Sequence, residues 1–176
     1  MSDGGVSIPF ITNRRRGNFL GATVCASLMV YAFFVQHGLG LVPCPLCILQ
    51  RIAIIATGSV FLVAALHNPG NAGARIYSFF LIVVTGLGAA VAGRHVWIQL
   101  LPPEEVPACG PGLDYMLEFF PLTDALRMVF EGSGECAKID WMFLGLSMPA
   151  WVFVALLGLA TYAVLVNWLL AQKSER

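Results

Sequence analysis

Residues 47–66 read CILQRIAIIATGSVFLVAAL, an apolar run of the length that an α-helix needs to cross a bilayer. Three other runs are similar, and together they predict membrane spans at 18–36, 47–66, 76–101 and 143–170. The composition agrees, since 58% of the 176 residues are hydrophobic, 11% are charged and the mean hydropathy is +0.79. We therefore expect an all-α membrane protein with a single domain, a bundle of four transmembrane helices.

The charges predict how this bundle is oriented. Basic residues flank the first span, the connection between the second and third spans, and the chain end: Arg14, Arg15, Arg16, Arg75, Lys173 and Arg176. Flanks with positive charge are usually cytoplasmic, so these segments should lie in the cytoplasm. The first span lacks a cleavage site and is expected to stay as an anchor, so four spans place both termini on that side. The loops at 37–46 and 102–142 should then be extracytoplasmic.

The long loop at 102–142 separates the third and fourth spans and is acidic, with eight Asp and Glu between Pro103 and Trp141. Its prolines and glycines indicate an irregular chain with short helices. Residues 124–130 suit a short amphipathic helix that either lies on the membrane surface or packs the loop on itself. The formal net charge is zero, which argues against a nucleic-acid partner recognised by a basic patch.

Four of the five cysteines fall in or beside the two outer loops, where disulfides are stable. Cys44 and Cys47 form a C-x-x-C, whereas Cys109 and Cys136 bracket the acidic loop. No metal is expected, because structural zinc sites usually take their ligands from two pairs of residues that are each close in the sequence, whereas Cys109 and Cys136 are far apart. Purely structural disulfides remain an alternative, although a C-x-x-C bond restrains little chain. Cys25, inside the first span, is interpreted as an inert apolar residue.

Cys47 should lie in the first turn of the second span, where backbone N–H groups and the helix dipole stabilise a thiolate. Arg51 follows one turn later on the same face, so it is a candidate to activate that sulfur. The alternative is that Arg51 extends to the lipid head groups.

A second polar group stands at the outer end of the third span. It contains Arg94, His95, Trp97 and Gln99. His95 and Gln99 share a helix face, which suits hydrogen bonds to a carbonyl-bearing ligand held between helices. The alternative is an interfacial anchoring belt.

These residues together resemble the DsbB family of bacterial disulfide bond formation proteins. The matching motifs are PCPLCILQR at 43–51, HVWIQ at 95–99, Cys109 in the loop, and GECAKIDWMFLGLSMP at 134–149. The resemblance covers most of the chain from the first span onward. It implies a multi-pass protein of the bacterial inner membrane with its redox cysteines facing the periplasm.

The resemblance also implies a relay of electrons. Cys109 would be attacked by a reduced DsbA-like periplasmic thiol oxidase and would release Cys136, which would then exchange with Cys44. Cys47 would meet the cofactor, ubiquinone or menaquinone from the respiratory quinone pool. Arg51, His95 and Gln99 would bind that quinone beside Cys47. DsbA, DsbB and quinone are the general system that keeps the bacterial periplasm oxidising.

Two other functions stay open. One is a non-enzymatic membrane scaffold whose disulfides are structural. The other is an enzyme like vitamin-K-epoxide reductase, which also joins cysteine pairs to a quinone. A C-x-x-C at the start of the second span would count against that second alternative.

Overall fold

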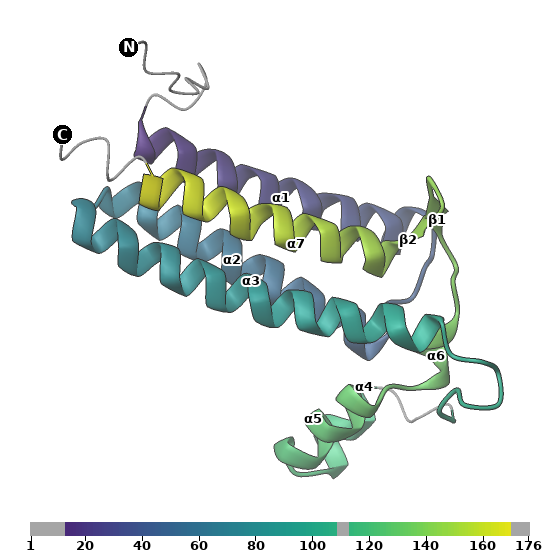
Figure 1. The fold of residues 1–176 in the computed structure, drawn as a ribbon. Helices are drawn as coiled ribbons and strands as arrows, with labels where there is room; N and C mark the ends of the chain where they lie inside the picture. The colour runs from purple at the N-terminus through teal and green to yellow at the C-terminus, as the bar shows by residue number, and fades with distance from the viewer. Residues whose placement is uncertain (1–12, 109–112, 170–176) are drawn as a thin grey trace.

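The computed structural model describes residues 13–108 and 113–169. Four long helices run along one another as an elongated bundle (Figure 1), and each is long and apolar enough to cross a membrane. They are α1 (Arg14–Gly38), α2 (Pro45–His67), α3 (Asn71–Gln99) and α7 (Met148–Val164), and a π-helical turn, η1 (Leu165–Leu169), continues α7. The predicted four-helix membrane bundle is thus confirmed.

Small residues let the long helices approach closely. A Cβ added at Gly58 of α2 would lie 2.9 Å from the Cys25 Cβ of α1, and one at Gly88 of α3 would lie 2.7 Å from the Ala53 Cβ of α2. Such contacts are typical of membrane bundles, where close backbone packing replaces the hydrophobic effect. Helix α1 packs along α2, α2 along α3, and α3 along α7, whereas α1 and α7 share few contacts. The bundle therefore opens between α1 and α7.

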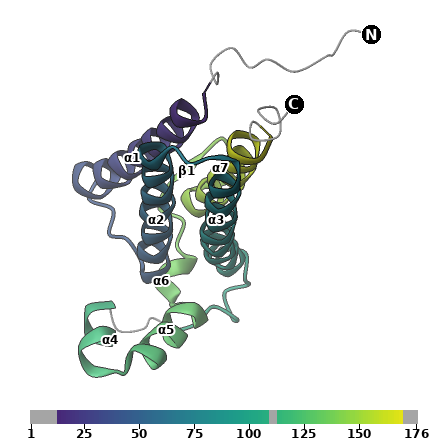
Figure 2. The ribbon, with the colours of Figure 1, turned by 90° about the vertical axis from the view of Figure 1, so that its left-hand side faces the viewer.

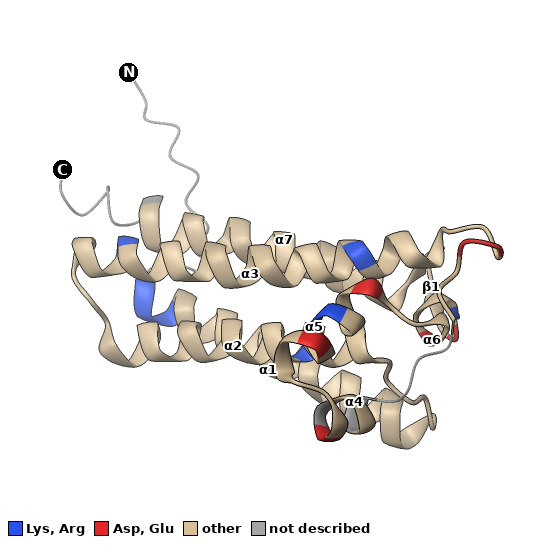
Figure 3. Cartoon of the chain, turned by 90° about the horizontal axis from the view of Figure 1, so that it is seen from below, with Lys and Arg blue, Asp and Glu red and all other residues tan. Residues whose placement is uncertain are grey.

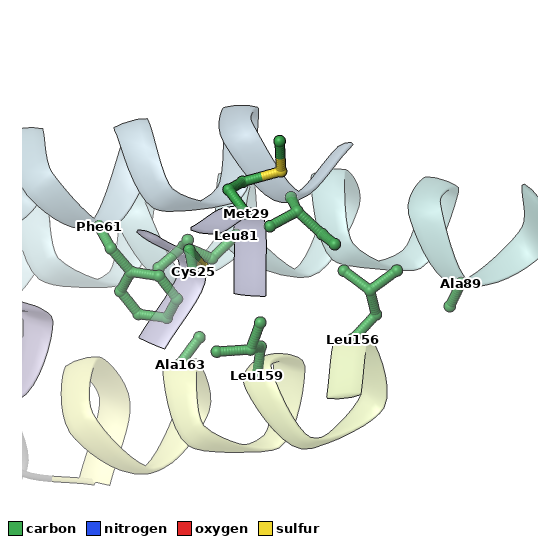
Figure 4. Packing of buried hydrophobic residues seen from close by; sticks show 9 residues of the cluster. Cys25, Met29, Phe61, Leu81, Ala89, Leu156, Leu159 and Ala163 are labelled. Atoms are coloured by element: carbon green, nitrogen blue, oxygen red, sulfur yellow. The ribbon is translucent and has the colours of Figure 1, made fainter. Parts of the chain in front are cut away.

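The core of the bundle lies where all four long helices meet (Figure 4). Its buried members are Cys25, Met29, Ile54, Phe61, Leu81, Ala89, Leu156, Leu159 and Ala163. Cys25 is 2% exposed and is surrounded by these apolar side chains. Its thiol is remote from the other described cysteines, which belong to a second cluster at one end of the bundle.

The chain between α3 and α7 folds against one end of the bundle (Figures 1 and 2). It contains α4 (Leu113–Phe119), α5 (Leu122–Glu131), α6 (Gly134–Ala137) and a hairpin of β1 (Met142–Phe143) and β2 (Leu146–Ser147). Helix α5 includes the predicted amphipathic segment. Ala125 and Val129 are buried in the second cluster, while Leu126 and Phe130 are exposed. One face of α5 thus packs against the protein, and contact of the other face with lipid stays a prediction.

The helix bounds differ most from the predicted spans at the starts of the third and fourth helices. The prediction of a span beginning at 143 was wrong, because residues 142–147 form the hairpin and α7 begins at Met148. Leu144 and Gly145 make the turn with φ values of 49° and 78°. The hairpin is as apolar as the helix that follows it, so hydropathy alone merges the two. The third helix begins at Asn71, five residues before the predicted start at 76, and ends at Gln99.

Figure 3 shows how charge divides along the bundle. Every Asp and Glu that the structure describes belongs to residues 102–142, at the end that carries α5 and α6. The opposite end holds the start of α1, the connection from α2 to α3 and the described end of η1, and its charged residues within the described chain are basic. This asymmetry is the pattern on which the predicted orientation rests.

Candidate active site

The C-x-x-C lies at the start of α2. Cys44 is the N-cap residue with extended backbone, Pro45 follows as the first helical residue, and Cys47 lies in the first turn. Proline suits this position because its fixed φ matches the helix and its missing N–H is not needed there. The Cys47 sulfur therefore lies near the first-turn N–H groups and the positive end of the helix dipole, which stabilise a thiolate.

His95 of α3 lies at the centre of the site and is 2% exposed. Its Nε2 donates to the Cys136 carbonyl oxygen at 3.1 Å, and its Nδ1 lies 3.0 Å from the Gln50 amide nitrogen. A carbonyl oxygen only accepts, so Nε2 carries the proton and the neutral ring accepts from Gln50 through Nδ1. The Cys44 sulfur lies 3.8 Å from Nε2 and the Cys47 sulfur 4.0 Å from Nδ1. His95 therefore contacts both sulfurs of the C-x-x-C.

Cys136 reaches this histidine from α6, far along the chain. Its side chain is 1% exposed, and its thiol sulfur, the Cys44 sulfur and a ring nitrogen of His95 lie within 4.8 Å of one another. The hydrogen bond with Cys44 and burial raise the pKa of the Cys136 thiol above its ordinary value. Cys44, Cys47 and Cys136 are free thiols in this structure. Cys109, the remaining predicted redox cysteine, lies outside the described residues.

A cavity of about 480 Å³ extends from these sulfurs into the opening between α1 and α7. Its polar end contains Cys44, Cys47, Gln50, Arg51, His95 and Gln99, and Glu135, Lys138 and Asp140 of the loop segment also line it. Its walls are mainly apolar and include Leu28, Tyr31, Val35 and Val152. The structure thus brings Cys47, Arg51, His95 and Gln99, all proposed from the sequence, to a single cavity.

Arg51 is held by α1. Its guanidinium donates to the Gln36 side-chain oxygen and, at 3.3 Å, to the Ala32 carbonyl oxygen, and it lies 5.6 Å from the centre of the Phe33 ring. Its described hydrogen bonds thus go to α1 and not to the Cys47 sulfur. Arg51 therefore presents its charge to the cavity from a fixed position, and direct activation of Cys47 stays a prediction.

The polar residues at the end of α3 divide into two groups. Gln99 faces the cavity, where its side-chain oxygen accepts a 2.6 Å hydrogen bond from Ser147. Arg94 instead donates to the carbonyl oxygens of Phe130 and Glu131, each at 3.2 Å, and lies over Trp97. These carbonyls belong to the last turn of α5, so Arg94 anchors that helix to α3.

Two glutamines belong to the site although sequence reasoning did not select them. Gln50 supports His95, and Gln36 holds Arg51. Both stand in or at the end of an apolar span, and a polar side chain in such a run usually faces a cavity or a polar partner. That signal was available, but it does not say which partner each glutamine meets.

The comparisons with known proteins agree with one another. A family model described as disulfide bond formation protein DsbB matches residues 14–166. A protein of Methylococcus capsulatus named disulfide bond formation protein B is 52% identical over 149 residues, which cover 85% of this chain and 91% of that protein. A protein of the same name from Nitrosococcus oceani is 53% identical over 83% of this chain and 86% of its own length. Another from Azoarcus sp. is 48% identical over 94% of this chain and 98% of its own length. The chain therefore belongs to the DsbB family of disulfide bond formation proteins.

Proposed function

We propose that this chain generates disulfides by passing electrons from a DsbA-like thiol oxidase, outside the cytoplasm, to a quinone in the bacterial inner membrane. The observation that carries the proposal is the meeting of three thiols and a cavity. Cys136 of the loop segment lies beside Cys44, and Cys47 opens onto a mainly apolar cavity between membrane helices. His95 thus lies next to the thiol of the polar loop segment and also lines the cavity between the membrane helices.

Thiol–disulfide exchange gives each sulfur a role. In the oxidised enzyme the partner's thiolate attacks Cys109 of a Cys109–Cys136 disulfide, forms a mixed disulfide and releases the Cys136 thiolate. Cys136 then attacks Cys44 of the Cys44–Cys47 disulfide, so that a Cys44–Cys136 bond forms and Cys47 leaves as a thiolate. A thiolate stabilised by its surroundings leaves more readily, and the helix start at Cys47 provides such surroundings.

The residues at the cavity suit a quinone. The walls are mainly apolar, as a lipid-soluble ring and tail require, and the polar end offers donors to ring oxygens from Arg51 and the Gln99 amide. His95 lines the same end, with its Nε2 proton shared with the Cys136 carbonyl oxygen. When bound, a quinone supplies the electron sink, since it accepts two electrons and two protons as a pair of thiols becomes a disulfide. Arg51 and His95 would hold it, and Cys47 would face it.

The decisive experiment mixes the purified protein anaerobically with a reduced periplasmic thiol oxidase and a soluble ubiquinone analogue, and follows quinone absorbance. We expect Cys→Ser at position 44, 47, 109 or 136 to abolish thiol-dependent quinone reduction. Cys25→Ser is the matched control and should keep the wild-type rate, because Cys25 is packed in the distant core. Full turnover by the Cys47→Ser protein would overturn the proposed electron exit.

The alternatives predict different outcomes. A scaffold with structural disulfides would show no effect of quinone on the redox state of its cysteines. In an enzyme like vitamin-K-epoxide reductase the C-x-x-C has a different place in the order of spans, whereas here it begins α2. Both the family and this position therefore favour the quinone-linked thiol oxidase.

A further inference from the structure

Cys44, Cys136 and His95 together form a set of side chains that could ligate a metal ion, which thiol exchange does not require. The three side chains come from the N-cap of α2, from α6 and from α3, and all three are buried. Two sulfurs and an imidazole nitrogen lie within 4.8 Å of one another. Thiolate and imidazole are the donors preferred by Zn²⁺ and similar thiophilic cations.

We propose that the reduced form of this chain binds a thiophilic divalent cation, of the Zn²⁺ or Cd²⁺ class, through Cys44, Cys136 and His95, and that the cation blocks thiol exchange. Binding displaces the two thiol protons and moves the Nε2 proton of His95 to Nδ1, so each donor presents a lone pair to the metal. Nothing is oxidised or reduced in this step.

The distances favour such a site once the hydrogen bond from His95 Nε2 to the Cys136 carbonyl oxygen is replaced by the metal and the side chains rotate. Around a tetrahedral zinc, with bonds of about 2.3 Å to sulfur and about 2.1 Å to nitrogen, neighbouring donor atoms lie about 3.5–3.8 Å apart. The Cys44 sulfur and His95 Nε2 already lie 3.8 Å apart. Drawing in the Cys136 sulfur needs a shift of about 1 Å at most. Three protein ligands leave a fourth position for water.

Gln50 is placed so that it can support either form of the His95 ring. A metal-bound imidazole needs an acceptor for the proton on its other ring nitrogen, and the Gln50 amide lies 3.0 Å from His95 Nδ1. In the metal-free ring the amide nitrogen donates to Nδ1. Rotation of the amide by half a turn presents its oxygen instead, so the same side chain supports the metal-bound ring.

The redox state of the cysteines controls this site. A Cys44–Cys47 or a Cys44–Cys136 disulfide removes at least one sulfur donor, so only the reduced enzyme offers the complete set. Cys44 and His95 both line the cavity, which gives a cation a route to them. Binding therefore competes with reoxidation, and soft metals should trap the enzyme after it has accepted electrons.

Co²⁺ titration tests the binding directly, without quinone or partner. The full chain in detergent is reduced, freed of reductant and titrated anaerobically with Co²⁺, whose visible and thiolate charge-transfer bands report tetrahedral sulfur ligation. We expect a single equivalent to bind to the reduced protein and none to the oxidised protein. Gln50→Leu should weaken binding about 10- to 100-fold, as expected on loss of a supporting hydrogen bond, and Cys136→Ser should weaken it further.

Cys25→Ser is the control and should bind like the wild type. Equal Co²⁺ affinity in wild-type, Cys136→Ser and His95→Phe proteins would overturn the proposal, because the cation would then be held by the C-x-x-C alone. The block is tested separately: Cd²⁺ should inhibit thiol-dependent quinone reduction, and a chelator should restore it. The inhibition test rests on the proposed function, whereas the Co²⁺ titration does not. Failure of the proposed function would therefore leave the Co²⁺ bands unchanged, and failure of the metal site would remove them.

Discussion

Arg51 is a charged residue within an apolar helix, and its contacts explain how the bundle accommodates it. A guanidinium at the centre of a membrane helix costs about 2.5–3.5 kcal/mol on insertion scales, and less near an end. Here the group donates to Gln36 and Ala32 of α1 and lies near the Phe33 ring. These contacts fix the charge at the polar end of the cavity.

Removal of this charge should therefore affect quinone use. We expect Arg51→Ala to raise the apparent KM for a soluble quinone about tenfold or more, because a hydrogen bond to a charged group contributes about 1.5–3 kcal/mol. Arg51→Lys should be intermediate, since it keeps the charge but loses the planar fork. The measurement is the quinone dependence of the initial rate.

The control for this series is Arg127→Ala. Arg127 pairs with Glu131 on the exposed face of α5, where the two side chains are 80% and 61% exposed, so its loss should leave the KM unchanged. An unchanged KM in Arg51→Ala would mean that Arg51 only packs and hydrogen-bonds against α1 and does not bind the quinone.

Residues of the site could be proposed from the sequence where reactive or polar residue types occur at the spacing that places them on one face of a helix. The C-x-x-C at a helix start, Arg51 one turn later, and His95 with Gln99 on one face all follow from local periodicity. Gln50 and Gln36 could not be assigned partners in this way. Their hydrogen bonds to His95 and Arg51 join different helices, and local periodicity does not specify which helices are neighbours.

At the scale of helices, α3 shows how glycine position determines packing. Gly88 faces α2 and α7, and an added Cβ would lie 2.7 Å from the Ala53 Cβ and 3.0 Å from Leu156. Gly86, two residues away, is exposed, and an added Cβ there would meet nothing within 4 Å. The two residues thus differ in packing although both lie in the same helix.

Gly88→Ala should destabilise the protein, whereas Gly86→Ala should leave it unchanged or slightly more stable. Overpacking costs about 1–3 kcal/mol, which the helix propensity of alanine, about 1 kcal/mol better than glycine, only partly offsets. Thermal unfolding in detergent measures both. Equal melting temperatures for the two variants would contradict the close approach of α3 to α2.

Helix α1 and η1, the turn that continues α7, are joined by a pair of buried amides. Asn18 and Asn167 are 2% and 1% exposed, and each donates to the other's side-chain oxygen at 2.9 Å. Tyr162 adds a hydrogen bond to the Gly17 carbonyl oxygen nearby. The opening between α1 and α7 is thus closed at this end by polar contacts, while the cavity occupies the other end.

A double-mutant cycle tests this pair. Asn18→Leu alone leaves the Asn167 side-chain oxygen without its partner, while the Asn167 Nδ2 keeps its hydrogen bond to the Ala163 carbonyl oxygen. We expect this loss to cost about 1–3 kcal/mol, and Asn167→Leu should act likewise. The double variant should be less destabilised than the sum of the two, since no amide remains unpaired. Additive losses in thermal stability would show that the amides do not depend on each other.

The elements themselves were largely predictable, and their packing was not. Hydropathy found all four long helices because a membrane span needs a long apolar run. It failed at residues 142–147, where Leu144 takes a positive φ that apolar residues rarely adopt, and where an apolar hairpin precedes α7. The placement of Cys136 beside Cys44 depends on how the chain after α3 folds back, which no local pattern specifies.

For the whole molecule, charge asymmetry along the bundle predicts its orientation. Arg14, Arg15, Arg16 and Arg75 lie at one end, which has no described Asp or Glu. Every described Asp and Glu lies at the other end, with the thiols and with Arg51, Arg94, Arg127 and Lys138. Positive flanks are retained in the cytoplasm, so the thiol site should face outward, where a periplasmic partner reaches it. The same orientation places Cys136 in an oxidising compartment.

Labelling of single cysteines tests this orientation in cells whose outer membrane has been made permeable. In a background where the cysteines at 44, 47, 109 and 136 are serine, Gly70→Cys and Glu105→Cys place one thiol at each end, both at exposed positions. A membrane-impermeant maleimide should label Glu105→Cys at once, because that end lies outside. It should label Gly70→Cys only after the inner membrane is opened. Cys25 remains in both variants as a buried internal standard and should stay unlabelled until the protein is denatured. The reverse order of labelling would place the thiols in the cytoplasm, where a periplasmic oxidase cannot reach them.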